Sequence, residues 1–408
     1  AAGVEVLTGV DVAVLERADG AIHLVLNANA GQTPGSCWRL SPDALVIATG
    51  AYDRVLPFPG WDLPGVYAAG GAQAMAKGEG IAVGRRVIVG GTGPLLLPVA
   101  ASLLEAGARV VGVHEANGPA RLARGMLARP WELAAMPGKA RELGEYAAAL
   151  ARGRVPFRLG EAVVEAMGEG RVEAVGVARL DERWRVVPGS RRTVEVDAAC
   201  VGHGFVPRLE LALAAGCQLT PERFVAVGPD MATSTAGVWA AGEVTGIGGA
   251  DAALAEGVIA GWAAGGGMGD VPAVRAARRR RNQADRFAER LGAAYGIGGE
   301  WRDWLTDQTV ICRCEGTTFG ALARTVEQTG ARAARTVKLA ARVGLGPCQG
   351  RQCGRTVAEL LDDAGPGLET RPVATPIRLA DLARLADSAR LAPGASPAAQ
   401  PDTPERRT

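Results

Sequence analysis

Hydrophobic and polar residues alternate over the first part of the chain in the pattern of β-strands. The alternation covers residues 4–14 and 21–27. A continuous apolar run at residues 44–48 is typical of a buried parallel strand, and Thr49-Gly50 ends it. Several prolines keep the next stretch out of regular structure, and residues 70–79 then predict a short helix. The chain therefore opens with a β-rich region.

The pattern changes to strand, glycine-rich turn and helix between residues 86 and 106. The strand ends in Gly90-Gly-Thr-Gly-Pro94, and an apolar helix follows. The next strand covers residues 109–114 and closes on Glu115. Further elements are predicted as helices at 119–152 and 250–264 and as strands near 161–167, 171–180, 193–201 and 237–241. Such an alternation of strands and helices predicts an α/β fold.

A glycine-rich stretch at 265–269 and the basic run Arg275–Arg281 precede a second unit. We expect the arginines to form a solvated helix face, with a docking surface as the alternative. Four of the 7 cysteines lie within residues 307–362, and the tail from about residue 385 has the composition of a disordered segment.

Composition narrows the class of protein. The 408 residues suggest two or three domains, and a net charge of +2 with 4% aromatic residues gives no reason to expect nucleic acid as a partner. No signal peptide is visible, and no apolar run reaches membrane-spanning length. We therefore expect a cytoplasmic protein without a transmembrane segment.

The cysteines form a CxC…CxxxxC pattern, Cys312-Arg-Cys314 followed by Cys348 and Cys353. Four thiolates can hold zinc or an iron–sulfur cluster. Structural zinc sites usually contain CxxC pairs, whereas a CxC pair and a CxxxxC pair fit a wider target, such as a 2Fe–2S cluster in which each pair serves one iron. Zinc and unligated thiols remain alternatives. Cys37, Cys200 and Cys217 have no partner at ligand spacing.

These motifs resemble a known family. Residues 310–315 and 344–354 are similar to the bacterioferritin-associated-ferredoxin-like (BFD-like) 2Fe–2S module that ends the alpha-type subunits of amine and imino-acid dehydrogenase complexes. That group includes the A component of opine oxidase, D-hydroxyproline dehydrogenase alpha subunits and the B component of hydrogen cyanide synthase. The resemblance covers nearly the whole chain. It implies a two-dinucleotide-binding-domain flavoprotein fold of Rossmann-like α/β type, with a small helical module holding the cluster on Cys312, Cys314, Cys348 and Cys353.

On this basis the chain divides into predicted domains. They are a partial FAD domain (1–65), an inserted NAD(P)-type nucleotide-binding domain (66–198), the C-terminal part of the FAD domain (199–270), a linker helix (271–306), the BFD-like 2Fe–2S domain (307–365) and a partly disordered tail (366–408).

The turn at Gly91-Thr-Gly93 has the context of a dinucleotide site. Glycines allow a pyrophosphate to approach the helix N-terminus, and Glu115, 22 residues past Gly93, can accept a hydrogen bond from a ribose hydroxyl. Leu96 replaces the third glycine of the fingerprint. We expect NAD or an adenosine nucleotide rather than NADP here, with a vestigial structural turn as the alternative.

Two further motifs resemble those that contact FAD in such folds. Thr49-Gly50 ends a strand of the "ATG" type, and Gly242-Glu243 resembles a motif whose acid bonds the ribityl or pyrophosphate end of the flavin. The strand–GxGxxG–helix unit that grips the ADP half of FAD is absent before residue 45, so the first βαβ is missing. We interpret the chain as truncated, the alternative being that FAD binding is weakened or lost.

No catalytic residue can be assigned. His23, His114 and His203 lack a nucleophile partner, and no redox CxxC follows the flavin strand. The resemblance implies an electron-transfer subunit that works with a FAD-containing beta subunit of the D-amino-acid-oxidase type, which oxidises a secondary amine, imino acid or opine-like substrate and passes electrons on to an acceptor. The alternatives are a self-contained NAD(P)H-dependent reductase and a non-catalytic nucleotide-binding scaffold.

Overall fold

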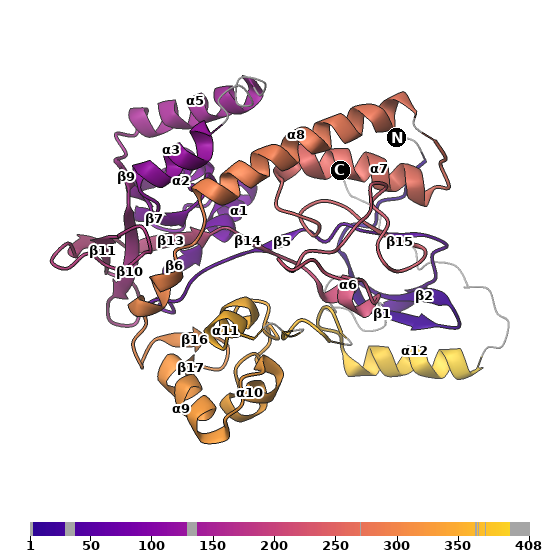
Figure 1. The fold of residues 1–408 in the computed structure, drawn as a ribbon. Coiled ribbons are helices and arrows are strands. Elements are labelled where there is room, and N and C mark those ends of the chain that lie inside the picture. Colours follow the sequence, from indigo (N-terminus) through magenta and orange to yellow (C-terminus); the bar gives the residue numbers. More distant parts are fainter. Residues whose placement is uncertain are drawn as a thin grey trace, which may run out of the picture. The chain divides into compact units, whose positions relative to one another are not determined.

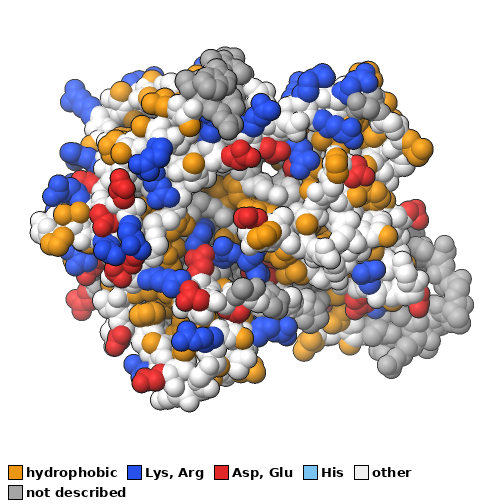
Figure 2. All heavy atoms as spheres, in the orientation of Figure 1, with side chains coloured by type: hydrophobic (Ala, Val, Ile, Leu, Met, Phe, Trp, Pro, Cys, Tyr) orange, Lys and Arg blue, Asp and Glu red, His pale blue; other side chains and the backbone are white. Residues whose placement is uncertain are grey.

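The computed structural model describes residues 3–28, 37–128, 137–269, 271–363, 365, 367–371 and 373–391. It divides the chain into two compact units, one formed by Ala1–Leu45 with Arg371–Thr408 and one by Val46–Thr370. The domain boundaries expected within the second unit stay predictions. No helix among the residues in these ranges is long and apolar enough to cross a membrane. Figure 2 shows basic and acidic side chains interspersed on the face drawn.

The first unit is a small antiparallel sheet that packs on the end of the chain. Strands β1 (Val10–Ala18), β2 (Ala21–Ala28) and β3 (Cys37–Leu40) pair in sequence order. Asp19 and Gly20 both have positive φ, as the tight turn between β1 and β2 requires. Helix α12 (Leu379–Leu391) belongs to the tail that we expected to be partly disordered, and residues 392–408 lie outside the described residues.

The larger unit contains a five-stranded sheet of order β6-β13-β7-β8-β9, and its paired strands run parallel (Figure 1). Its strands are β6 (Val66–Ala68), β7 (Arg86–Thr92), β8 (Arg109–Glu115), β9 (Phe157–Leu159) and β13 (Ala198–His203). Helices α1 (Ala69–Glu79), α2 (Leu96–Glu105), α3 (Pro119–Leu127) and α5 (Pro137–Arg152) belong to the same region.

Successive side chains of β7, the central strand, point to opposite faces of the sheet and pack against different neighbours. Val87 and Val89 pack with Leu96 and Leu103 of α2, whereas Ile88 packs with a second, three-stranded sheet. That sheet is formed by β10 (Glu161–Met167), β11 (Ala174–Arg179) and β12 (Arg192–Glu195). The strand–turn–helix prediction for residues 86–106 is confirmed by β7 and α2. Both faces of the sheet are covered, as is usual for parallel sheets.

The remaining elements of the larger unit form the flavin-motif region and the cysteine module. The former contains β4 (Leu45–Ile47), β5 (Ala51–Asp53), β14 (Phe205–Pro207), α6 (Glu210–Ala214), β15 (Val238–Ala240), α7 (Gly249–Ala264) and α8 (Pro272–Ala294). The latter contains η2 (Gly299–Trp304), β16 (Val310–Cys312), β17 (Thr317–Thr318), α9 (Phe319–Thr329), α10 (Ala334–Ala341) and α11 (Gly354–Leu360). The module has its own core, which includes Ile311, Leu322, Val337, Val343 and Val357.

Three expectations need correction. The run at 44–48 is not buried along its whole length: β4 pairs only with β15 among the described strands, and Val46 is 37% exposed. The stretch 193–201 is split between β12 and β13, which belong to different sheets. The basic run lies on α8, but Arg281 is not simply solvated, because it forms an ion pair of 3.1 Å with the buried Glu256.

Candidate functional site

The four cysteines of the CxC…CxxxxC pattern lie in loops of one module. Cys312 ends β16, Cys314 follows in the turn to β17, and Cys348 and Cys353 flank the turn that leads into α11. Cys312 and Cys353 are buried, Cys348 is half-buried and Cys314 is exposed. Two loops far apart in the sequence are therefore held together by the module's core, with one edge of the cysteine set open to solvent.

The sulfurs form two pairs, and each pair joins the two motifs. Cys312 interacts with Cys353, and this hydrogen bond together with backbone N–H groups, including that of Gly344, lowers the pKa of Cys312 to about 6 against the effect of burial. The same bond and burial raise the pKa of Cys353. Cys314 bonds with Cys348, and its own pKa is raised chiefly by burial. The sequence suggested instead that each motif would supply one pair.

This donor set suits a cluster with two metal centres better than a single ion. Thiolates in two pairs, stabilised by backbone N–H groups, are the ligands that a 2Fe–2S cluster takes. The four cysteines could therefore hold a 2Fe–2S cluster.

A glycine makes room for the cysteine set. A Cβ added at Gly346 would lie 2.2 Å from Cβ of Cys314, far inside ordinary van der Waals contact. The backbone of the loop before Cys348 therefore approaches the other motif more closely than any side chain would allow. The sequence shows that this loop is rich in glycine but does not say which glycine is needed, because the contact joins residues 32 positions apart.

The cysteine hairpin is attached to the region of the five-stranded sheet through Trp61. The indole Nε1 of Trp61 donates to the Val310 carbonyl at 2.5 Å, and the Arg313 guanidinium stacks on the indole ring at 4.8 Å. Arg313 also donates to the carbonyl of Val66 at 3.4 Å. Arg313 lies between two of the cysteines, so these contacts hold the CxC turn directly. No sequence pattern indicated them.

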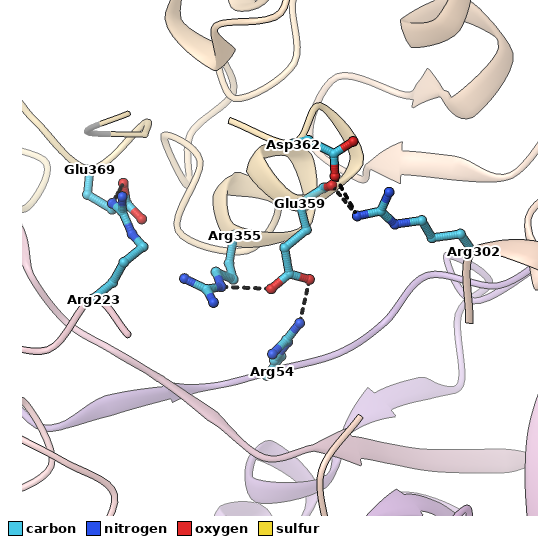
Figure 3. Close-up of polar contacts among 7 residues, drawn as sticks. All are labelled: Arg54, Arg223, Arg302, Arg355, Glu359, Asp362 and Glu369. Carbon is cyan, nitrogen blue, oxygen red and sulfur yellow. Dashed lines mark hydrogen bonds and ion pairs between the residues drawn. The ribbon is translucent and has the colours of Figure 1, made fainter. Parts of the chain in front are cut away.

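A cluster of ion pairs attaches helix α11, which begins directly after Cys353 (Figure 3). Arg54, just past β5, and Arg355 both point at the Glu359 carboxylate, with distances of 2.5 and 2.8 Å. Arg302 of η2 donates to the Glu359 carbonyl at 2.5 Å and to Asp362 at 3.1 Å. Figure 3 also shows Arg223 beside Glu369, an ion pair of 2.9 Å. Arg54 and Arg302, which both lie outside α11, thus hold this helix to earlier parts of the chain.

A cavity of about 250 Å³ lies where these elements meet. Its walls include Tyr52, Arg54, Phe205, Glu210, Gly350 and Arg351. Arg351 comes from the turn between Cys348 and Cys353, and it pairs with Glu210 of α6 at 2.9 Å. The turn that carries two cysteines therefore faces the strands that follow the first flavin motif.

The two flavin-type motifs are brought together by pairing of β4 and β15. Ala241 N donates to the Ile47 carbonyl at 3.0 Å, which places Gly242-Glu243 beside the strand that leads to Thr49-Gly50. The Thr49 hydroxyl donates to the Arg208 carbonyl at 2.8 Å, and Gly50 has a φ of 72°. Both motifs therefore form tight, anchored turns.

Glu243 is half-buried, and burial raises its pKa. Its carboxylate makes no hydrogen bond to any other residue that the structure describes, so it is available to a ribityl or ribose hydroxyl and fits FAD. A residue that sequence reasoning missed supports this turn. The buried Glu256 of α7 accepts hydrogen bonds from Gly242 N at 2.7 Å and from the Thr245 hydroxyl at 2.8 Å. Its partner Arg281 completes the support.

In the third motif, the turn at Gly91-Thr-Gly93, the polar groups hydrogen-bond to Glu115. Glu115 accepts from Gly93 N at 2.9 Å and from the Thr92 hydroxyl at 2.7 Å, and it is 1% exposed. Gly91 is required for another reason: an added Cβ would lie 1.7 Å from the carbonyl oxygen of Gly202 on the neighbouring strand. The groups expected to bind a nucleotide are thus bonded to each other, and they do not fit an ordinary NAD site as they stand.

His23 Nδ1 lies 2.7 Å from the Ser41 hydroxyl, so the expectation that this histidine lacks a serine partner is wrong. The other two histidines are buried. His203 is buried beside Trp184 and Trp304, which stack on each other at 5.8 Å, and burial with the nearby Arg54 lowers its pKa to about 3. Burial also lowers the pKa of His114 to about 4, although it bonds Glu161 at 3.0 Å. Neither contacts a nucleophile among the bonds above, and the catalytic residue stays unknown.

Comparison with known families decides the assignment of the fold. Residues 1–257 match the model of the pyridine nucleotide-disulphide oxidoreductases, and residues 310–363 match the BFD-like [2Fe-2S] binding domain. The chain belongs to the pyridine nucleotide-disulphide oxidoreductase family. The first match confirms the expected fold class and the FAD cofactor of this FAD-dependent oxidoreductase. The second match spans all four cysteines and the helices between them, and it confirms the 2Fe–2S cofactor.

Individual relatives show which members of the family this chain is similar to. It is 33% identical over 319 residues to the hydrogen cyanide synthase component HcnB of Pseudomonas aeruginosa, which covers 76% of this chain and 68% of that protein. It is 30% identical over 393 residues to the A component of opine oxidase from Agrobacterium tumefaciens, with 90% and 75% covered. The crystal structure of L-proline dehydrogenase from P. horikoshii shares the fold, with a TM-score of 0.59, 15% identity, and 91% and 64% covered. The resemblance to components of this type is confirmed.

Proposed function

We propose that this flavoprotein is the electron-transfer (alpha) subunit of a dehydrogenase complex that oxidises a secondary amine, imino acid or opine-like amino-acid derivative. Electrons would pass from flavin through a 2Fe–2S cluster held by Cys312, Cys314, Cys348 and Cys353. Such a cluster exchanges one electron at a time, whereas a flavin accepts two, so the pair converts between the two kinds of transfer. The relatives named above are themselves subunits, which supports this role.

The attachment of the cysteine module carries the proposal. Trp61 and Arg313 tie the CxC turn to the nucleotide-binding region, and the Arg54–Glu359 ion pair ties the helix after Cys353 to the strand beyond Thr49-Gly50. An electron carrier must keep a fixed separation from its donor, and this double attachment supplies a fixed position. A module that served only as a storage site for metal would not need it.

Other parts of the proposal concern partners. We infer a FAD-containing beta subunit of the D-amino-acid-oxidase type as the site of substrate oxidation, because no substrate base is found among the residues assigned above. A separate electron acceptor then receives the electrons. The cytoplasmic location and the absence of nucleic acid as a partner stay predictions.

The test is a visible and EPR spectrum of anaerobically purified protein, with flavin extracted and iron counted. We expect about two irons per chain and a signal from a reduced 2Fe–2S cluster. Serine variants of Cys312 and Cys348 should lose both, whereas a serine variant of Cys217, which is buried but outside the module, should keep them. Zinc in place of iron, or a cluster that cannot be reduced, would favour the scaffold alternative and refute the proposal.

A further inference from the structure

The linker between the flavin-motif region and the cysteine module crosses one edge of the five-stranded sheet. Figure 1 shows α8 running from α7 to α3, after which the chain continues toward η2. Strands β7 and β8 end there in Thr92 and Glu115. In open parallel sheets, the carboxyl ends of the strands form the crevice in which nucleotides bind. The linker therefore lies where a dinucleotide would be expected.

The phosphate-binding end of this crevice lacks two of its usual donors. The N–H of Gly93 would face a pyrophosphate in an ordinary site, but here it donates to the Glu115 carboxylate at 2.9 Å. Pro94 has no N–H to offer. Leu96, which replaces the third glycine, is 1% exposed and belongs to the core. A buried carboxylate occupies the place that an anionic ligand would need.

At the ribose-binding end of the crevice, the Glu115 carboxylate is also already hydrogen-bonded within the protein. Besides Gly93 N, the Glu115 carboxylate accepts from the Thr92 hydroxyl at 2.7 Å and from Asn117 N at 2.9 Å. The Asn117 amide donates to Thr92 Oγ1 at 2.8 Å and accepts from Trp184 Nε1 at 3.2 Å. These bonds use the acceptors that a ribose hydroxyl would require, and they continue toward the linker.

The start of the linker contacts this network and the helix that follows it. The Tyr295 carbonyl oxygen lies 3.3 Å from the Thr92 hydroxyl oxygen, whose single proton goes to Glu115 at 2.7 Å. Arg290 donates to the Met126 carbonyl at 2.9 Å. An added Cβ at Gly125 of α3 would lie 2.5 Å from Ala294 N, so the two backbones touch directly.

The end of the linker is held by tryptophans. Trp304 stacks on Trp184 at 5.8 Å and donates from its indole to the Trp184 carbonyl at 3.0 Å. An added Cβ at Gly298 would lie 2.3 Å from the Trp184 ring. These contacts run from Arg290 to Trp304 and hold the linker against α3 and Trp184.

We propose that residues 290–304 occupy the nucleotide crevice of this unit permanently, so that it binds no NAD(P)H and serves instead to anchor the cysteine module. Glu115 is then a structural acceptor for the turn and linker rather than a ribose ligand. This assignment goes beyond the electron-transfer role proposed above, and it removes the site on which a self-contained NAD(P)H-dependent reductase would depend.

The first test is nucleotide binding to the full chain with its cofactors. NADH is titrated while energy transfer from tryptophan is followed, since Trp184 borders the crevice, and NADPH and ADP are titrated separately. We expect no saturable binding up to about 1 mM, the upper end of ordinary enzyme affinities. One-to-one binding that weakens tenfold or more in Glu115→Gln would overturn the proposal. Binding that this variant leaves unchanged would lie elsewhere and would support it.

The second test is hydrogen exchange in the linker. Glu115→Gln and Thr92→Val should accelerate exchange of the amides in residues 290–296 several-fold, whereas Glu105→Gln, an acid at the end of α2, should leave them unchanged. Thr92→Val keeps the carboxylate and still gives the answer if Glu115→Gln does not fold. Unchanged linker exchange in both variants overturns the proposal. Neither test depends on cluster reduction, so a failure of the electron-transfer role remains distinguishable.

Discussion

Replacing Gly346 with alanine should displace Cys314 and abolish iron binding without unfolding the protein. The added carbon would lie 2.2 Å from Cβ of Cys314. Nonbonded carbons rest about 3.5–4.0 Å apart, so the two must separate by roughly 1.3–1.8 Å. Metal–ligand distances tolerate only about 0.2 Å, so the displacement is several times larger than a cluster would accept.

The cost to folding should be much smaller than the effect on the cluster. Overpacking of this kind typically costs about 1–3 kcal/mol, and Cys314 lies at the exposed edge of the module, where the loop can yield. We therefore expect Gly346→Ala to be purified as a folded flavoprotein that lacks most of its iron.

The assay compares iron per chain, the visible spectrum and the thermal unfolding midpoint of wild type, Gly346→Ala and Gly354→Ala. Gly354 follows Cys353 directly, but an added Cβ there would meet only Cβ of Leu368 at an ordinary 3.5 Å. The control should keep its iron. A Gly346→Ala protein with full iron and an unchanged spectrum would refute the reasoning, because it would show that Cys314 is not held at its observed distance from this loop.

Three further predictions concern the attachment of the module and the buried histidine. Arg313→Gln should shift the reduction potential of the cluster to more negative values in an EPR-monitored titration, because a positive charge beside the cysteines and its stacking on Trp61 are both lost. Glu359→Gln should lower the free energy of unfolding by about 1.5–3 kcal/mol in urea denaturation, since it leaves the guanidinium of Arg54 without its charged partner. His203 has a pKa of about 3 when folded, so the unfolded chain binds the extra proton below about pH 6.5 and stability falls with pH from there toward 3; His203→Gln should reduce this slope by up to about 1.4 kcal/mol per pH unit.

Each of these has a matched control. Arg332→Gln and Glu327→Gln change charges of the same module outside the attachments described above, and they should alter neither potential nor stability appreciably. His23→Gln, in the other unit, should leave the acid slope of the larger unit unchanged. The first inference is contradicted if Arg313→Gln has the reduction potential of wild type, and the second if Glu359→Gln has the same free energy of unfolding as wild type. The third is contradicted if stability depends on pH as steeply in His203→Gln as in wild type.

Local sequence patterns were sufficient to predict several helices and strands. The strand, glycine turn and helix at residues 86–106 follow from apolar periodicity and from the backbone freedom of glycine, both of which are properties of short segments. The four cysteines could be singled out by their spacing, while their role as cluster ligands stays a prediction. The buried run at 44–48 was misjudged, since burial depends on what covers a strand and not on its own composition.

The sequence by itself thus determined the class of fold, the cysteine set and the positions of the nucleotide-type turns. Only the tertiary structure decided which of these groups are free to act. Glu115 looked available to a ribose, yet it is bonded to Gly93 and lies beneath a linker about 180 residues further along the chain. The partners of Glu359 and Arg313, Arg54 and Trp61, lie some 250–305 residues away. Periodicity reports a segment's own shape, whereas such contacts are set by packing between distant segments, and this is why they could not be read in advance.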